Sequence, residues 1–473
     1  MKEEFKIAWR NLWRNRRRTM ITSASIFFAV FFAAIMRSYQ LGSYDHMINN
    51  LIESFTGHLQ VQHIKYQDNP LIDNSFDYSD SIASAISGID EVVSVTPHLE
   101  SFTLASSGAQ TKGSAVVAID PVKERSFSDP ESKLVKYRIT DEAIKRLTET
   151  GTIPDDILDR LKENLGRAYS SSARLELELG LSDEESELFL PQILKCSLAL
   201  NGYLANNDDG ILVSDRLASY LKVTIGDSVI LMGQGYHGVS ATGIFPVRGI
   251  IKMPSPEIDN KLIIMTITAA QKFYDAEDKI TSLVVNLTDK SNRLLKTVKT
   301  RINLLLQDKN TTAKTWYELN PILYQQIQGD SQSGAAMLGL LYFIIFFGIF
   351  GTVLMMVSER KREFGVLVAI GMQKNKLKRT VTIEMMLLGA VGLVCGLLAS
   401  VPLILYFYYY PVILKGDLAN MMEDYGWDAV MPTAWFGPYF YWQAVIVAIM
   451  VVLATLYPLR KIGKLKEIEA LKG

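Results

Sequence analysis

The sequence has few cysteines, almost no net charge and no phosphate-binding loop, and each absence limits what the protein can be. Its 473 residues include only Cys196 and Cys395, so a disulfide scaffold is excluded. The net charge of −1 argues against a protein built around nucleic-acid contacts. No G-x-x-x-x-G-K-[ST] motif occurs, so the chain does not bind ATP through a P-loop.

Charged residues are also missing from four stretches of the chain. These uncharged stretches are Met20–Met36, Ala335–Val357, Met385–Tyr410 and Tyr441–Tyr457. A bilayer core about 30 Å thick takes about 20 apolar residues in a helix. We therefore predict membrane spans, with Trp, Tyr and Arg side chains extending the shorter two, at residues 20–41, 333–357, 380–410 and 439–459. The alternative, four buried helices of a soluble fold, is disfavoured because uncharged runs of this length are rare there.

Basic residues flank the predicted spans on one side. Residues 1–20 and residues 358–379 each carry seven Lys/Arg against two Glu, and residues 459–473 carry five against two. Residues 42–330, in contrast, carry 28 Lys/Arg against 39 Asp/Glu. The positive-inside rule therefore predicts that both termini, with the 460–473 tail, and the 358–379 loop are cytoplasmic. Residues 42–330 and the 411–438 loop are then expected on the outer side.

The large segment between the first two spans, residues 42–330, alternates strand and helix patterns, which predicts a mixed α+β domain. Residues 210–231 indicate a strand, a short helix, a turn and a second strand. A charged stretch at 129–190 has a helical pattern split by Gly151 and Pro154, and we interpret it as an inserted helical subdomain. The predicted fold is a membrane protein with one span, a large extracytoplasmic domain and then three spans.

Residues that match motifs for catalysis or metal binding lack the surrounding sequence pattern that such sites need. Residues 233–238 match G-x-G-x-x-G, but a strand pattern follows instead of a helix, so a hairpin loop is favoured over a dinucleotide site. His58 and His63 lie five residues apart on a predicted strand and would point to opposite faces, so no metal site is predicted. Ser and His are too scattered to form a triad, and we expect a non-catalytic subunit.

The first 19 residues predict an amphipathic helix in the headgroup layer. Apolar and aromatic residues recur at helical spacing from Phe5 to Trp13, and Lys6, Arg10, Arg14 and Arg17 occupy the other side. An ordinary positive-inside flank is an equally good and compatible interpretation. Membrane lipids are thus an expected partner.

The predicted spans contain small residues instead of mid-span ionisable groups. The absence of such groups disfavours an ion-coupled carrier, which usually needs them as relays. Gly348 and Gly351 in the second span, and Gly389, Gly392 and Gly396 in the third, allow close helix packing. Packing within the chain and packing against a second chain both remain open.

The 358–379 loop is too apolar at its centre for a solvated linker. Its residues 364–370 form an apolar strip between charged flanks, bounded by Gly365 and Gly371. A short helix at the cytoplasmic surface would present this strip to a partner protein. A lipid-facing interfacial helix is the alternative.

Residues 351–371, GTVLMMVSERKREFGVLVAIG, with Glu384 opening the next helix, resemble the FtsX-like permease domain of the MacB/Lol-type (type VII, mechanotransmission) ABC transporters. The AWRNLWRNRRRT segment before the first span and the order of one helix, a large outer domain and three helices are similar to that family too. Within the outer domain, residues 56–62, 210–227 and 243–265 look like the lipoprotein-releasing, Lol-type branch.

The resemblance implies partners and a mechanism. The chain would pair with a second permease chain, identical or paralogous, and with a dimer of a separate cytoplasmic ABC ATPase that binds the ATP and Mg. Nucleotide-driven closure would move the outer domain mechanically. The ATPase-coupling residues implied by the motif are Glu359, Arg360, Glu363, Phe364, Gly365, Val366, Leu367, Ala369 and Gly371.

For the activity, the resemblance implies release of lipoproteins from the bacterial inner membrane, with a periplasmic lipoprotein chaperone as a further partner. MacB-like efflux of peptides or drugs and FtsX-like signalling to cell-wall hydrolases are the alternatives within the family. A membrane-anchored scaffold without an ATPase is disfavoured by the apolar strip at residues 364–370.

Overall fold

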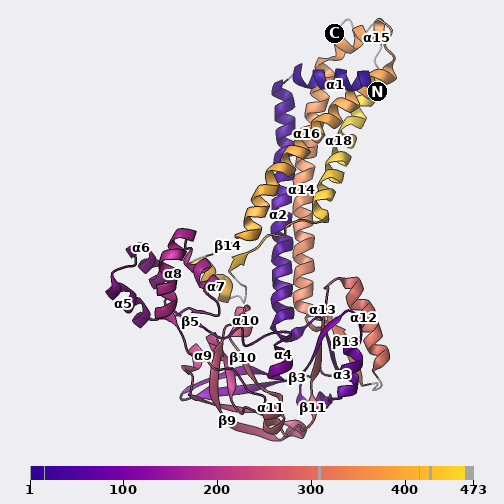
Figure 1. The fold of residues 1–473 in the computed structure, drawn as a ribbon. Helices are drawn as coiled ribbons and strands as arrows, with labels where there is room; N and C mark the ends of the chain where they lie inside the picture. Colours follow the sequence, from indigo (N-terminus) through magenta and orange to yellow (C-terminus); the bar gives the residue numbers. More distant parts are fainter. Residues whose placement is uncertain (1, 15, 307–309, 415, 425–428, 464–473) are drawn as a thin grey trace. The chain divides into compact units, whose positions relative to one another are not determined.

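The computed structural model describes all residues except 1, 15, 307–309, 415, 425–428 and 464–473 (Figure 1). The chain divides into two compact units. We call residues 1–46, 324–412 and 430–473 the membrane unit, and residues 47–323 and 413–429 the ectodomain.

In the part of the chain that the structure describes, six helices build the membrane unit. They are α1 (Lys2–Arg14), α2 (Arg16–Leu51), α14 (Pro321–Glu359), α15 (Lys361–Ala369), α16 (Lys374–Tyr409) and α18 (Pro438–Gly463). Among the described residues, four of these helices, namely α2, α14, α16 and α18, are long and apolar enough to cross a membrane. This confirms the predicted number and order of spans.

Apolar side chains from all four long helices form one shared core. Ile26 of α2, Ile349 of α14, Leu388 of α16 and Val451 of α18 are buried in it. The outer faces carry exposed apolar side chains such as Phe343, as expected where lipid replaces water as the solvent. The bundle is therefore packed inside and apolar outside.

Several helix boundaries differ from the predictions; for example, α14 begins at Pro321 and not at residue 333. The N-terminal helix ends at Arg14 instead of at residue 19, and Arg16 already begins α2. Helix α2 then continues past residue 41 to Leu51. Hydropathy marks only the part of a helix that lipid surrounds, and the polar residues that follow contain no proline to end the helix.

The ectodomain is organised around one nine-stranded sheet. Its strands, in the order in which they pair, are β13 (Thr311–Thr315), β1 (Leu59–His63), β12 (Ser282–Leu287), β3 (Val92–Ser107), β4 (Gln110–Ile119), β10 (Leu262–Thr266), β7 (Ile211–Ser214), β9 (Ser240–Ile251) and β8 (Ser228–Gln234). Helices α3 (Asp80–Ser87) and α12 (Asn292–Leu305) pack against the part formed by β3 and β13.

The far end of the sheet closes on itself. Strand β8 pairs with the second half of β3, with Leu104 opposite Met232, so six strands from β3 to β8 form a ring around an apolar core. The first half of β3 pairs with β12. Strand β3 therefore belongs to both parts of the sheet and connects them.

Short helices and turns decorate the ectodomain strands. These elements are η1 (Ile52–Thr56), η2 (Ile72–Asn74), α4 (Pro121–Glu124), α9 (Asp215–Leu221), η3 (Tyr236–Gly238), α10 (Pro256–Asp259), α11 (Ile267–Tyr274), α13 (Trp316–Leu319) and α17 (Asp417–Asp424). Among the described residues, two-residue strands pair in three places, β2 (Phe76–Asp77) with β11 (Lys279–Ile280), β14 (Val412–Ile413) with β15 (Val430–Met431), and β5 with β6 of the insertion described next. The G-x-G-x-x-G segment lies at the β8–β9 hairpin, as predicted.

The predicted helical insertion is a small subdomain with its own core. It contains β5 (Tyr137–Arg138), α5 (Asp141–Thr150), α6 (Asp155–Glu163), β6 (Ala168–Tyr169), α7 (Ser172–Leu179) and α8 (Asp183–Ser197). The predicted end of the insertion at residue 190 falls just before Pro191. This proline lies inside α8 without ending it, so the helix continues to Ser197. Ile157, Leu161 and Ile193 are among the fully buried residues of the insertion.

The glycines of the third span pack against helices of the same chain. A Cβ atom at Gly392 would lie 2.7 Å from Ile26 Cβ, and one at Gly396 would lie 2.9 Å from the Phe27 carbonyl oxygen. At Gly389 it would lie 2.8 Å from a methyl carbon of Val451. At Gly348 and Gly351 of α14, a Cβ atom would meet nothing within 4 Å among the described residues.

The difference in space around Gly392 and Gly348 predicts different effects on stability when each is replaced by alanine. Gly392→Ala should lower the thermal stability of the purified protein, because the added methyl group overpacks the α2–α16 contact at a cost of about 1–3 kcal/mol. Gly348→Ala, the control, should leave it unchanged or raise it, since alanine favours the helix where space is open. Equal melting temperatures for the two variants would contradict this packing.

Candidate coupling site

Helix α15 connects α14 to α16 and divides the predicted apolar strip into two faces. Phe364 is buried with Val357, Leu377 and Ile462, the end residues of the three long helices around it, and Val368 packs against the same cluster. Leu367 is 37% exposed and Ile370 is 79% exposed. One face of the strip therefore fixes α15 to the bundle, and the other is open.

The end of α15 requires a glycine. Gly371 has φ of +105°, a conformation that side-chain-bearing residues rarely adopt. Its N–H donates to the carbonyl oxygen of Val368 at 3.0 Å, and the N–H of Met372 donates to that of Leu367 at 3.0 Å. This is the hydrogen-bond pattern of a Schellman motif, and it ends the helix directly after the exposed Ile370.

A buried ion pair holds the beginning of α15. Arg360 Nη1 donates to both carboxylate oxygens of Glu384 on α16, at 3.1 and 3.0 Å. The Glu384 side chain is 3% exposed and that of Arg360 19%, and the guanidinium also lies 5.4 Å from the centroid of the Phe364 ring. Removing one partner of such a pair leaves a buried charge, which costs about 3–5 kcal/mol.

A second ion pair links α15 to the N-terminal helix. Arg14 Nη2 donates to Glu363 Oε2 at 2.6 Å, and Arg360 Nε donates to the same oxygen at 3.3 Å. Burial raises the pKa of Glu363, but the hydrogen bonds and charges of Arg14 and Arg360 outweigh it and lower the pKa overall. The carboxylate therefore stays ionised between two arginines and connects α1 to α15, and Arg360 extends the contact to Glu384 on α16.

The residues predicted for coupling all lie in or beside α15. Glu359 is the last residue of α14, Arg360 precedes α15 and Gly371 follows it. Phe364 and Gly365 are buried. The exposed members of the predicted set are Glu359, Glu363, Val366, Leu367, Ala369 and Gly371. The geometry can support docking of a protein partner, and the assignment of coupling itself stays a prediction.

Comparison with known families agrees with this arrangement. Residues 335–466, which include α15, α16 and α18, match the family described as FtsX-like permease C-terminal. The chain carries an FtsX-like permease domain.

Proteins of known name are also similar to this chain. The lipoprotein-releasing system transmembrane protein LolC of Xylella fastidiosa (strain 9a5c) is 22% identical over 274 residues, and LolC of Neisseria meningitidis serogroup B is 23% identical over 276. Each match covers 55% of this chain and 64% of the relative, so the chain spans less than two thirds of the relatives' length.

A further relative combines two functions in its name. The probable syringafactin export ATP-binding/permease protein SyfD of Pseudomonas syringae pv. syringae is 30% identical over 110 residues, which cover 22% of this chain and 17% of SyfD.

Two solved structures are similar to part of the chain. The extracellular domain of the noncanonic ABC-type transporter YknZ from Gram-positive bacteria is 11% identical, with a TM-score of 0.28. The match covers 54% of this chain and 99% of the YknZ chain. The periplasmic region of MacB from Actinobacillus actinomycetemcomitans is 11% identical, with a TM-score of 0.30, and covers 59% and 95%.

Outside the FtsX-like permease domain, the chain segments that follow α2 and precede α14 are hydrogen-bonded neighbours in the ectodomain. Strands β1 and β13 pair with Leu59 opposite Thr315, and the N–H of Trp316 donates to the His58 carbonyl oxygen at 3.1 Å. Gly57 has φ of +66°, and a Cβ atom there would lie 2.4 Å from Val284 Cγ1. The entry of the chain into the sheet is therefore tightly packed.

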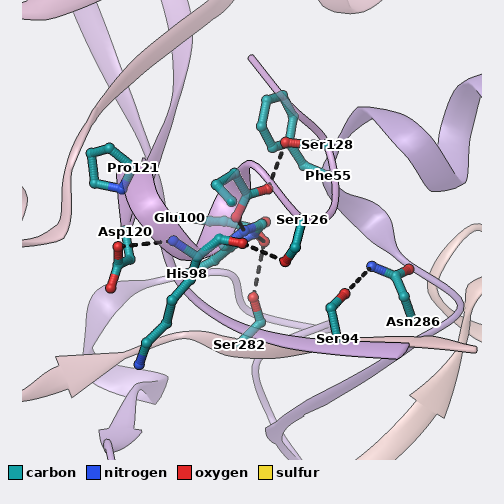
Figure 2. A network of polar contacts seen from close by, with 12 residues as sticks. Phe55, Ser94, His98, Glu100, Asp120, Pro121, Ser126, Ser128, Ser282 and Asn286 are labelled. Carbon is teal, nitrogen blue, oxygen red and sulfur yellow. Dashed lines mark hydrogen bonds and ion pairs between the residues drawn. The ribbon is translucent and has the colours of Figure 1, made fainter. Parts of the chain in front are cut away.

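A fully buried histidine lies beside this entry (Figure 2). His98 Nε2 is 2.9 Å from Glu124 Oε2, and both side chains are inaccessible to solvent. Ser128 Oγ donates to the other oxygen of Glu124 at 2.6 Å, and the His98 ring lies edge-on to Phe55 of η1, with centroids 6.1 Å apart. Burial lowers the pKa of His98, but the charge of Glu124 outweighs it, with help from Glu100, and raises the pKa overall.

The two buried pairs, Arg360–Glu384 and His98–Glu124, could not be predicted from the sequence. Arg360 lies within the segment quoted for the family resemblance and Glu384 in the helix after it, but their sequence separation gives no sign that they pair. His98 follows Pro97 in a strand pattern, and only its inward position on β3 could have singled it out. Glu124 lies 26 residues further along the chain, and no spacing rule connects it to His98.

The buried His98–Glu124 pair predicts a pH-dependent stability. Because its folded-state pKa is raised, protonated His98 stabilises the fold fully below its unfolded pKa of about 6.5, and this contribution is lost as pH rises through the folded-state pKa. His98→Gln should therefore lower the melting temperature of the full chain most at acidic pH and less at alkaline pH. His237→Gln, at an exposed position, is the control. A deficit independent of pH would contradict the assignment.

Proposed function

We propose that the chain is the permease subunit of an ABC transporter in the bacterial inner membrane. It receives mechanical work from a separate cytoplasmic ATPase dimer, which binds the ATP and Mg. The observation that carries the proposal is the two-sided α15, which is fixed to the bundle by Arg360–Glu384 and Phe364 and exposes Leu367 and Ile370. An exposed apolar strip on a rigid support is suited to bind a protein partner.

The connections between helices and strands support a mechanical role. Helices α2 and α14 have 36 and 39 residues, which corresponds to about 54 and 58 Å at 1.5 Å per residue, more than a bilayer core of about 30 Å needs. Helix α2 continues through η1 into β1, and β13 continues through α13 into α14. Because β1 and β13 are hydrogen-bonded to each other, movement of either helix would act directly on the sheet.

For the substrate, we propose lipoproteins that are released from the inner membrane toward the outer membrane. The relatives named LolC support this choice. Efflux of peptides or drugs is the second candidate, and the relative named for syringafactin export supports a role in export. The permease would act as a dimer, either with a second copy or with a paralogue, and a periplasmic lipoprotein chaperone would accept the product.

The exposed strip of α15 predicts how to uncouple the ATPase. Leu367→Asp combined with Ile370→Asp should abolish co-purification of the co-encoded ATPase, because the charges would be buried without partners in the interface. Ile244→Asp is the control, since Ile244 is equally apolar and 70% exposed but lies on β9 of the ectodomain. Retention of the ATPase by the double variant would refute the coupling role of α15.

The substrate class can be tested by site-specific photo-crosslinking. With the crosslinker at Asp45 near the end of α2 or at Gln332 on α14, we expect capture of acylated lipoproteins during ATP hydrolysis. The crosslinker at Lys145, exposed on α5 of the insertion, should capture none. Capture of only soluble peptides would favour efflux, and capture of nothing together with altered activity of a cell-wall hydrolase would favour signalling.

A further inference from the structure

Three aromatic side chains lie exposed along one side of α1. Phe5 is 51% exposed, Trp9 42% and Trp13 51%, and their four-residue spacing places them on one face. The rings of Trp9 and Trp13 contact each other edge-to-face, with centroids 6.0 Å apart. The sequence pattern had grouped them with Ala8 and Leu12, but these two are buried, and α1 packs against α16. The aromatic face is therefore separate from the face that holds α1 to the bundle.

Cations flank this aromatic face. Lys6 and Arg10 are exposed and four residues apart, and Arg16 and Arg17 are exposed at the beginning of α2. Helix α2 is the first membrane span, and its first apolar residues, Met20 and Ile21, are exposed as well. Exposed apolar side chains thus occur on both α1 and the adjoining start of the first span, and the charges that flank the aromatic face complement anionic headgroups.

We propose that α1 binds the anionic lipid of the membrane through Phe5, Trp9 and Trp13 and the cations Lys6 and Arg10, and that this contact sets the position of α15. The connection is the ion pair of Arg14 with Glu363, 2.6 Å long, whose carboxylate also contacts Arg360. The lipid contact is independent of the proposed function. Its effect on α15 rests on the proposed coupling to an ATPase.

The lipid contact is tested on the permease chain alone. The full chain is placed in phosphatidylcholine nanodiscs, with and without brominated phosphatidylglycerol, and quenching of Trp9 and Trp13 is obtained as the difference from a Trp9→Phe/Trp13→Phe variant. We expect phosphatidylglycerol to add quenching that Lys6→Gln/Arg10→Gln loses. Lys145→Gln/Arg146→Gln, which removes two cations from α5, should retain it. Equal quenching in the two lipid mixtures, or full quenching in Lys6→Gln/Arg10→Gln, would overturn the proposal.

The effect on α15 is tested with the co-encoded ATPase bound. We expect ATP hydrolysis by the complex to be faster with phosphatidylglycerol than without it, and Glu363→Gln to lose this difference while quenching of Trp9 and Trp13 persists. A lipid-dependent rate that survives in Glu363→Gln would overturn the role of the Arg14–Glu363 pair. If no ATPase binds the wild-type chain, the proposed function fails, whereas the quenching result still decides the lipid contact.

Discussion

The ion pair between Arg360 and Glu384 is the constraint on which the coupling site depends. A carboxylate buried near the beginning of α16 needs a cation, and the guanidinium of Arg360, whose Nη1 donates to both carboxylate oxygens, supplies it. This fixes the start of α15, and Gly371 fixes its end. With both ends set, Phe364 can only face the bundle, and Leu367 and Ile370 remain exposed. The open face of α15 is thus a consequence of a buried charge next to it.

A comparable logic applies in the ectodomain. Gly57 allows the chain to approach Val284 closely, and His98 and Glu124 neutralise each other beneath Phe55. Both features replace flexible linkage with close packing at the segment that follows α2. Since β3 carries His98 and also closes the six-stranded ring, a displacement at this entry would be passed along one continuous strand.

The properties that could be predicted from the sequence are those that depend on local pattern. Uncharged runs revealed four spans, and the residue pattern of 210–231 revealed β7, α9 and β8. The ends of helices that extend beyond the lipid could not be predicted. Hydropathy gives no signal for the polar residues after residue 41 through which α2 continues to Leu51. The division of the apolar strip into inner Phe364 and outer Leu367 depends on the neighbouring helices. The pairs Arg360–Glu384 and His98–Glu124 join distant residues that no local pattern connects.

The interior of the bundle favours transmission of movement over passage of a solute. Among the described residues, the polar contacts between helices near mid-span include a hydrogen bond in which the Tyr342 hydroxyl donates to the Gln443 side chain. Both of these groups are neutral. Gly389, Gly392 and Gly396 bring α16 against α18 and α2, so these helices are closely packed where they cross. Helices that are closely packed and uncharged can still shift as rigid bodies. Under the proposed function, work applied at α15 would reach the ectodomain through the helices themselves.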